Sequence, residues 1–155
     1  MVRVEKLQQR HRQGLKALIK EVYAEQPSAF TFNAEPDDSQ LDALLDKKMK
    51  LVKSSKLVDL VAEKEGRPIG ECEIAVQEPE RLGVIGIIVS NEERRKGIAT
   101  ALLYKSIEEA KRKGAKLFVA QVNKGNKPAI AVFKARGFRL AAKVQNHLIF
   151  KKAEY

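Results

Sequence analysis

A chain of 155 residues, 44% hydrophobic and 32% charged, is long enough to fold around a single core. We expect residues 1–155 to form a single domain. Its 30 Lys and Arg against 20 Asp and Glu give a formal net charge of +10, which favours polyanionic partners: nucleic acid, an anionic membrane surface or a phosphorylated cofactor. A single cysteine excludes a disulfide framework or a cysteine-rich zinc site. We expect a cytoplasmic protein, because the sequence shows no signal peptide and no apolar run near the roughly 20 residues that span a bilayer.

The N-terminal segment predicts a strand followed by a helix. Residues 2–7 alternate between apolar and polar, which is typical of a short strand. The apolar residues that follow at helical spacing predict a helix ending near Glu25, before the break at residues 26–28; they are Leu15, Leu18, Ile19 and Val22. The connection beyond it contains Phe30 and Phe32. These two rings either lie over a substrate pocket or fill the core.

A second helix and two strands follow. Capping side chains at residues 37–39 precede another helical stripe, formed by Leu41, Leu44, Leu45, Lys48 and Met49. Residues 57–64 and 69–76 predict two antiparallel strands around a turn at 65–68. In the second strand the even positions, including Cys72, are apolar, so Glu71 and Glu73 share the opposite face. We expect Cys72 to be a core residue, because no His or Asp lies near it in the sequence to activate the thiol.

The next segment changes from strand to helix across a basic turn. Residues 84–89 are β-branched except for Gly86, which predicts a strand buried on both faces. A helical stripe then runs from Ala99 to Ala110, and Gly114 ends it. The first turn of a helix leaves N–H groups unpaired and carries roughly half a positive charge. Small Gly97 and Ala99 keep that backbone accessible, and the preceding residues 94–96 add three cations, so the turn predicts a phosphate-binding site.

The C-terminal part closes the sheet. Residues 116–122 predict a strand parallel to 84–89, because a helix connects the two. Asn126 is placed to cap a helix that begins at Lys127 and ends at Gly137. Residues 138–140 and 145–151 predict a hairpin whose turn the pattern does not locate. The remaining basic clusters, Lys47–Lys53 and Lys111–Lys113, are interpreted as solvated helix faces, as is Tyr104. The expected fold is a mixed α/β sheet: an antiparallel meander, a β-α-β unit and a closing hairpin.

Two motifs carry a family resemblance. The string Arg94-Arg95-Lys96-Gly97-Ile98-Ala99, between a buried strand and an amphipathic helix, and the segment from Asn126 to Phe138 resemble the two signatures of the GNAT superfamily of acyl-CoA-dependent N-acyltransferases. The resemblance implies the GNAT element order β-α-α-β-β-β-α-β-α-β-β. It also implies acetyl-CoA as cosubstrate, lying in a gap between splayed parallel strands, with Gly86 as a reasonable bulge position.

The resemblance also assigns residues to roles. The cofactor-binding positions that it implies are Ile87, Ile88, Val89, Arg94, Arg95, Lys96, Gly97, Ile98, Ala99, Thr100, Asn126 and Phe133. Phe133 stands where many members have a proton-donating Tyr, and residues 81–84 lack the Glu that some members place there. Glu73 and Glu71 are the substitutes we predict as general base; the alternative is an exposed carboxylate pair. His11 and His147 show no metal-ligand spacing, so we predict no metal.

The leading hypothesis is an N-acetyltransferase that passes the acetyl group directly to a primary amine: a protein N-terminus, a lysine or a small molecule. The alternative is a non-catalytic acyl-CoA-binding sensor or interaction module, which the change to Phe133 favours. A nucleic-acid-binding domain is a third reading of the charge, but no reading helix or aromatic strip accompanies it. We expect no membrane partner, and a homodimer is left open.

Overall fold

The computed structural model describes residues 1–154 and contains one seven-stranded sheet. The strand order is β1-β2-β3-β4-β5-β7-β6, and every neighbouring pair is antiparallel except β4 and β5. The bounds of the strands are β1 Val2–Lys6, β2 Leu57–Lys64, β3 Arg67–Gln77, β4 Leu82–Val89, β5 Leu117–Asn123, β6 Arg139–Val144 and β7 His147–Ala153. The mixed fold and the predicted order of helices and strands are therefore confirmed.

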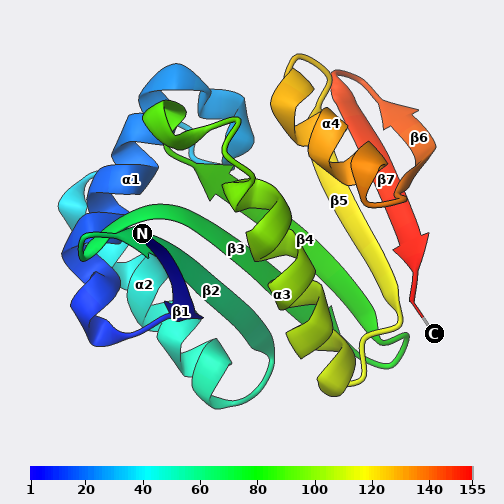
Figure 1. Cartoon of the computed structure of the whole chain (residues 1–155), viewed down its shortest axis with the longest axis horizontal. Coiled ribbons are helices and arrows are strands. Elements are labelled where there is room, and N and C mark those ends of the chain that lie inside the picture. Colours follow the sequence, from blue (N-terminus) through cyan, green and yellow to red (C-terminus); the bar gives the residue numbers. More distant parts are fainter. Residues whose placement is uncertain (155) are drawn as a thin grey trace.

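Two pairs of helices cover opposite faces of the sheet. The helices are α1 Arg12–Glu25, α2 Asp38–Lys53, α3 Ile98–Arg112 and α4 Lys127–Ala135, with short 3-10 turns at Gln9–His11, Pro27–Ala29 and Asn91–Glu93. Helices α3 and α4 lie in front of the sheet in Figure 1. Helices α1 and α2 pack on the other face, because their apolar stripes share a cluster with Val61 of β2. None of the helices in residues 1–154 combines the length and hydropathy that crossing a bilayer requires.

The larger core lies under α3 and α4. Phe118 and Phe150 from the sheet, with Leu102 and Leu103 from α3, are fully buried there. Burying each of these side chains contributes roughly 1.5–3 kcal/mol. Cys72 belongs to the same core, as predicted, and its burial raises the pKa of the thiol to about 12.

The parallel strands β4 and β5 separate halfway along their length. They pair from Leu82↔Leu117 to Ile85↔Ala120, whereas β4 stays paired with β3 as far as Val89. Figure 1 shows the two strands together at the lower end and apart at the upper end. The β3–β4 register runs through Gly86 without a shift, so the predicted bulge at Gly86 is wrong. Gly86 instead marks the first residue of β4 beyond its pairing with β5.

The structure also corrects the closing hairpin. Its turn is at Gln145 and Asn146, and β7 begins at His147 instead of at residue 145. Gln145 adopts a left-handed backbone with φ of 55°. Glycine and asparagine are the usual residues for that conformation, so a glutamine at this position is a weak local signal for a turn.

Candidate active site

The basic turn before α3 presents unpaired backbone donors. Arg95 and Gly97 both have positive φ, 64° and 80°, which directs the start of α3 toward the end of β4. No side chain caps the helix, and its first internal hydrogen bond runs from the N–H of Ala101 to the carbonyl of Gly97 at 3.0 Å. The N–H groups of residues 98–100 thus lack a helical partner. The space where a Gly97 side chain would begin is open, so an anion can approach this backbone.

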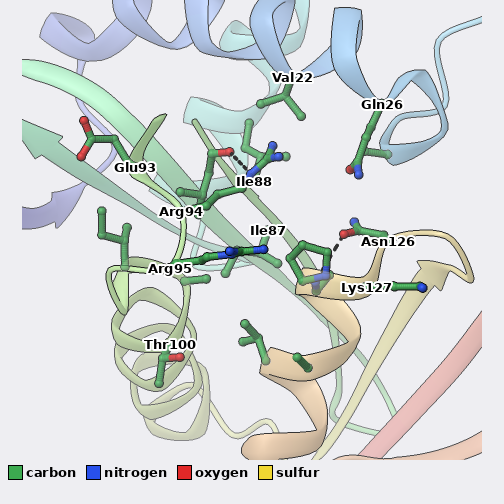
Figure 2. Close-up of a pocket in the computed structure, with 18 of the residues that line it drawn as sticks. Val22, Gln26, Ile87, Ile88, Glu93, Arg94, Arg95, Thr100, Asn126 and Lys127 are labelled. Carbon is green, nitrogen blue, oxygen red and sulfur yellow. Dashed lines mark hydrogen bonds between the residues drawn. The ribbon is translucent and has the colours of Figure 1, made fainter. Parts of the chain in front are cut away.

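An outer cavity of about 510 Å3 opens in front of this turn. Figure 2 shows it between α1, the end of β4 and the N-termini of α3 and α4. It brings together ten of the predicted cofactor residues: Ile87, Ile88, Val89, Arg94, Arg95, Gly97, Ile98, Ala99, Thr100 and Asn126. The cavity is also lined by Val22 of α1, by Gln26 just after α1 and by Lys127 of α4. The sequence did not indicate these three residues, because no motif marks them. Asn126 caps α4, accepting from the Ala129 N–H at 3.3 Å.

The three cations of the turn take different positions. Arg95 extends across the cavity toward α4 in Figure 2, and it has no ion pair within residues 1–154. Arg94 turns toward α1, donating to the Val89 carbonyl at 3.2 Å and pairing with Glu25. Lys96 does not line the cavity; its Nζ lies 3.1 Å from the carboxylate of Glu93. Arg95 is therefore the cation placed to meet an anion in the cavity.

An inner cavity of about 350 Å3 lies where β4 and β5 part. It adjoins the outer one, because Gln26, Ala29, Ile87, Asn126 and Ala129 line both. Phe133 lines its α4 side and is otherwise buried against Phe138 and Phe150, with ring centroids 5.1 and 6.3 Å away. The ring has no hydroxyl, so Phe133 offers this cavity an apolar wall and no proton.

The far side of the inner cavity contains residues that sequence reasoning missed. Gln121 and Asn123 of β5 and His147 of β7 line it, and Phe30 and Thr31 cover it. Phe30 lines this cavity and also packs against the smaller core, whereas Phe32 stacks on Phe30 at 5.5 Å and lines neither cavity. Only Phe30 therefore fits the expectation of a ring over the pocket. The pairing of Asn123 with His147 is the feature that creates this wall. No motif marks it, and only the strand order would have indicated it.

The predicted bases Glu71 and Glu73 lie outside both cavities. Lys48 of α2 places its Nζ 3.0 Å from Glu71, 2.9 Å from Glu73 and 3.5 Å from Asp59. Glu71 is 4% exposed, so the alternative of an exposed carboxylate pair is wrong for it. Lys48 is 8% exposed, so its interpretation as part of a solvated helix face is also wrong. Both were misread because their partners come from other elements. Glu73 is half-exposed and borders Gly86.

Burial and charge act against each other in this cluster. Burial disfavours the Glu71 anion, but the charge and hydrogen bond of Lys48 together with its other polar neighbours outweigh burial and lower the pKa of Glu71. Burial lowers the pKa of Lys48, but the charges of Glu71, Asp59 and Glu73 together outweigh burial, so that pKa is raised. Asp59 differs: burial and then the charge of Glu71 raise its pKa well above the usual value, and neither oxygen has a hydrogen-bond partner within residues 1–154. Glu71 is thus held as a paired anion, a poor state for accepting a proton.

One group of side chains has the composition of a metal site. Glu5, His11 and Glu63 have ligand atoms within 4.8 Å of one another. Arg10 already occupies the position of a cation: it pairs with Glu5 and donates to both oxygens of Glu63, at 2.8 and 2.6 Å. His11 accepts from the N–H of Gln8 at 2.9 Å, which leaves its other nitrogen facing Glu63. The group is an ion-pair cluster.

This cluster predicts a loss of stability in acid. Hydrogen bonds from Arg10 lower the pKa of Glu63 from 4.5 to about 2 against the opposing effect of burial, so the folded state binds its proton less tightly than the unfolded state. The resulting stabilisation is complete above pH 4.5 and is lost as the pH falls toward 2. Because Arg10 is half-exposed, we expect about 1–2 kcal/mol. Urea unfolding at pH 6 and pH 3 should show a steeper loss for the wild type than for Glu63→Gln, and parallel losses would contradict this origin.

The comparisons with known proteins agree with this geometry. A family match over residues 17–138 defines the class as an acyl-CoA-dependent acetyltransferase. Two adjoining cavities agree with it, one where the parallel strands part and one at a helix start with unpaired N–H groups. The matching model is that of the acetyltransferase (GNAT) family, and the chain belongs to this family. A comparison with curated protein sequences gives no match.

Solved structures share the fold across nearly the whole chain. Ribosomal-protein-alanine N-acetyltransferase from Brucella melitensis has 20% identity and a TM-score of 0.82, covering 98% of this chain and 99% of its own. The putative acetyltransferase yncA from Salmonella typhimurium, solved with acetyl-CoA, has 16% identity and a TM-score of 0.84, covering 99% and 94%. PaiA N-acetyltransferase from Thermoplasma acidophilum, in complex with coenzyme A, has 15% identity and a TM-score of 0.79, covering 99% of each chain. At these identities the similarity establishes the fold alone.

Proposed function

We propose that this protein transfers an acetyl group from acetyl-CoA directly to a primary amine. The observation that carries the proposal is the pair of adjoining cavities that extends from the start of α3 to the gap between β4 and β5. The diphosphate would bind the N–H groups of residues 98–100 and the guanidinium of Arg95. The pantetheine arm would follow residues 87–89 of β4, and the thioester would lie in the inner cavity. The Salmonella and Thermoplasma neighbours, solved with acetyl-CoA and coenzyme A, support the choice of cosubstrate.

The parted strands supply what acetyl transfer requires. Beyond Ile85, backbone groups of β4 that point toward β5 have no strand partner, so they are available to the pantetheine amides and to the thioester carbonyl. An N–H that donates to the carbonyl oxygen stabilises the negative charge that develops there during attack by the amine. Holding the amine beside the thioester then replaces a bimolecular encounter with a positioned one.

Binding and turnover, measured together, test this proposal. We expect calorimetry to show binding of coenzyme A, and a thiol-release assay with acetyl-CoA and primary amines to show amine-dependent turnover. Phe133, which cannot protonate the departing thiolate, specifically favours the alternative of an acyl-CoA-binding module. Binding of acetyl-CoA with no turnover on any amine would support that module. A lack of measurable coenzyme A binding would overturn both.

The ion pair between Glu25 and Arg94 predicts an effect on cofactor affinity. Glu25 ends α1 and pairs with Arg94, which lines the outer cavity, so its carboxylate competes with a diphosphate for the same guanidinium. Glu25→Gln should therefore bind coenzyme A about twofold to fivefold more tightly, as expected for a partly exposed ion pair. Glu92→Gln removes an exposed charge near the same turn without touching Arg94 and should change the affinity less than twofold. Weaker binding by Glu25→Gln in calorimetry would contradict the competition.

A further inference from the structure

The inner cavity is lined by a single ionisable side chain. Its walls are made of aliphatic, aromatic, amide and hydroxyl groups, and of the residues that line it only His147 is ionisable. No carboxylate lines it, and the nearby Glu73 is already bound by Lys48 at 2.9 Å. An amine in this cavity therefore finds one proton acceptor and no counter-ion for a persistent positive charge.

The position of His147 separates the two reactants. Leu148 and Phe150 of β7 pack into the core under α3 and α4, so strand alternation places His147 on the opposite face of the sheet. Phe133 of α4 thus reaches the cavity from one face and His147 from the other. A thioester that lies along α4 would be attacked from the His147 side, under the cover formed by Phe30 and Thr31.

No charged residue pairs with His147 on a neighbouring strand or lines the cavity beside it. Its strand neighbours are Asn123 on β5 and Val144 on β6, and neither titrates. Across the cavity it faces Gly86 of β4, Phe133 of α4 and the covering residues 28–31, which are also uncharged. No ion pair within residues 1–154 includes it, the nearest charge on its own strand face being Lys151.

The basicity of the amine decides which acceptor an imidazole can serve. A free imidazole has a pKa of about 6.5, an α-amino group about 8 and a lysine amine about 10.4. The equilibrium constant for moving a proton from an α-ammonium to an imidazole is thus unfavourable by about 1.5 pKa units, or roughly thirtyfold. For a lysine ammonium the same equilibrium is unfavourable by a factor of nearly ten thousand. No carboxylate in the cavity makes up this difference for the more basic amine.

We propose that His147 is the general base and that the acceptor is a weakly basic primary amine of the α-amino type, such as a peptide N-terminus. This inference rests on the proposed function. His147 removes one proton from the ammonium; the freed lone pair forms the N–C bond to the thioester carbon and the C–S bond breaks. The second proton of the new amide nitrogen neutralises the thiolate, and His147 returns its proton to solvent. The products are the amide, the free thiol and one proton.

The first test detects the contact without turnover. The chain has two histidines, so its imidazole NMR spectrum contains two sets of signals, and His147→Gln assigns them by deleting one. Saturation with coenzyme A should shift the signals of His147 and leave those of His11, which is 1% exposed and held by Gln8 and Glu63 outside both cavities. Unmoved His147 signals in a chain that binds coenzyme A by calorimetry would overturn the inference and leave the proposed function standing.

The second test measures catalysis with two defined amines, alanylglycinamide and Nα-acetyl-lysine methylamide. At pH 7.5 we expect kcat/KM at least tenfold higher for the α-amine. His147→Gln should lower kcat/KM by about 100-fold or more, keep the KM for acetyl-CoA within twofold, and abolish the acidic limb of the pH profile. Lys151→Gln, on the same face of the same strand, is the matched control and should stay within twofold of wild type.

The outcomes distinguish a failure of the proposed acetyl transfer from a failure of the role assigned to His147. Three results would each overturn this inference alone. In the first, His147→Gln keeps wild-type rates and the acidic limb of the pH profile. In the others, Glu73→Gln loses that limb instead, or the enzyme prefers the lysine amine. Absence of wild-type turnover on both amines and on a wider panel, with coenzyme A binding intact, would overturn the proposed function and this inference with it.

Discussion

Replacing Arg95 with Gln is expected to weaken coenzyme A binding by about tenfold to a hundredfold. Arg95 is the cation that extends across the outer cavity, and it has no ion pair within residues 1–154 to hold it elsewhere. A charge-assisted hydrogen bond to a phosphate contributes roughly 1.5–3 kcal/mol, which corresponds to this loss. Calorimetric titration of wild type and variant with coenzyme A measures it directly.

Two controls show whether the loss belongs to the diphosphate contact. Lys96→Gln removes a neighbouring charge that pairs with Glu93 and does not line the cavity, so it should change the affinity less than threefold. Pantetheine lacks the phosphates and should bind more weakly than coenzyme A. Its affinity should be the same for the wild type and for Arg95→Gln. Equal losses from Arg95→Gln and Lys96→Gln would show that only net charge matters, and the assigned role of Arg95 would then be wrong.

The elements of this fold and the cofactor loop could be predicted because each is encoded locally. The β-branched run of β4, the stripe of α3 and the turn at Gly97 lie within 30 consecutive residues, and two contiguous motifs carry the resemblance. A pattern of this kind depends on neighbours one to four positions away along the chain. The outer cavity therefore brings together the residues of the predicted loop except Lys96.

The predictions that failed concern residues whose partners lie far along the chain. Lys48 occupies a helical stripe among lysines, and only the packing of α2 on β2 and β3 places it against Asp59 and Glu71. His147 was passed over because its neighbours in sequence are unremarkable, whereas the pairing of β7 with β5 sets it beside Asn123 in the inner cavity. Strand order is a tertiary property, and a single sequence contains no local signal for it.

Replacing Lys48 with Met is expected to destabilise the fold by about 3–5 kcal/mol. The substitution keeps most of the apolar stem but leaves the Glu71 carboxylate buried with no cation, next to Asp59, and removal of one partner from a buried ion pair typically costs this much. Urea unfolding at pH 7 measures the loss. Lys47→Met, one residue earlier on the exposed side of α2, is the matched control and should stay within about 0.5 kcal/mol of wild type.

The pH dependence of this loss identifies its cause. In the wild type, the charge of Lys48 lowers the pKa of Glu71 against the effect of burial, so this stabilisation is present above the unfolded pKa and falls as acid protonates the carboxylate. In Lys48→Met the charge of Lys48 no longer opposes burial, so the pKa of Glu71 rises, and protonation on acidification relieves the buried charge. The deficit of the variant should therefore shrink between pH 8 and pH 5, and the added change Glu71→Gln should recover part of it at pH 7. A deficit that is constant with pH would mean that Lys48 stabilises through packing of its stem, since packing does not titrate.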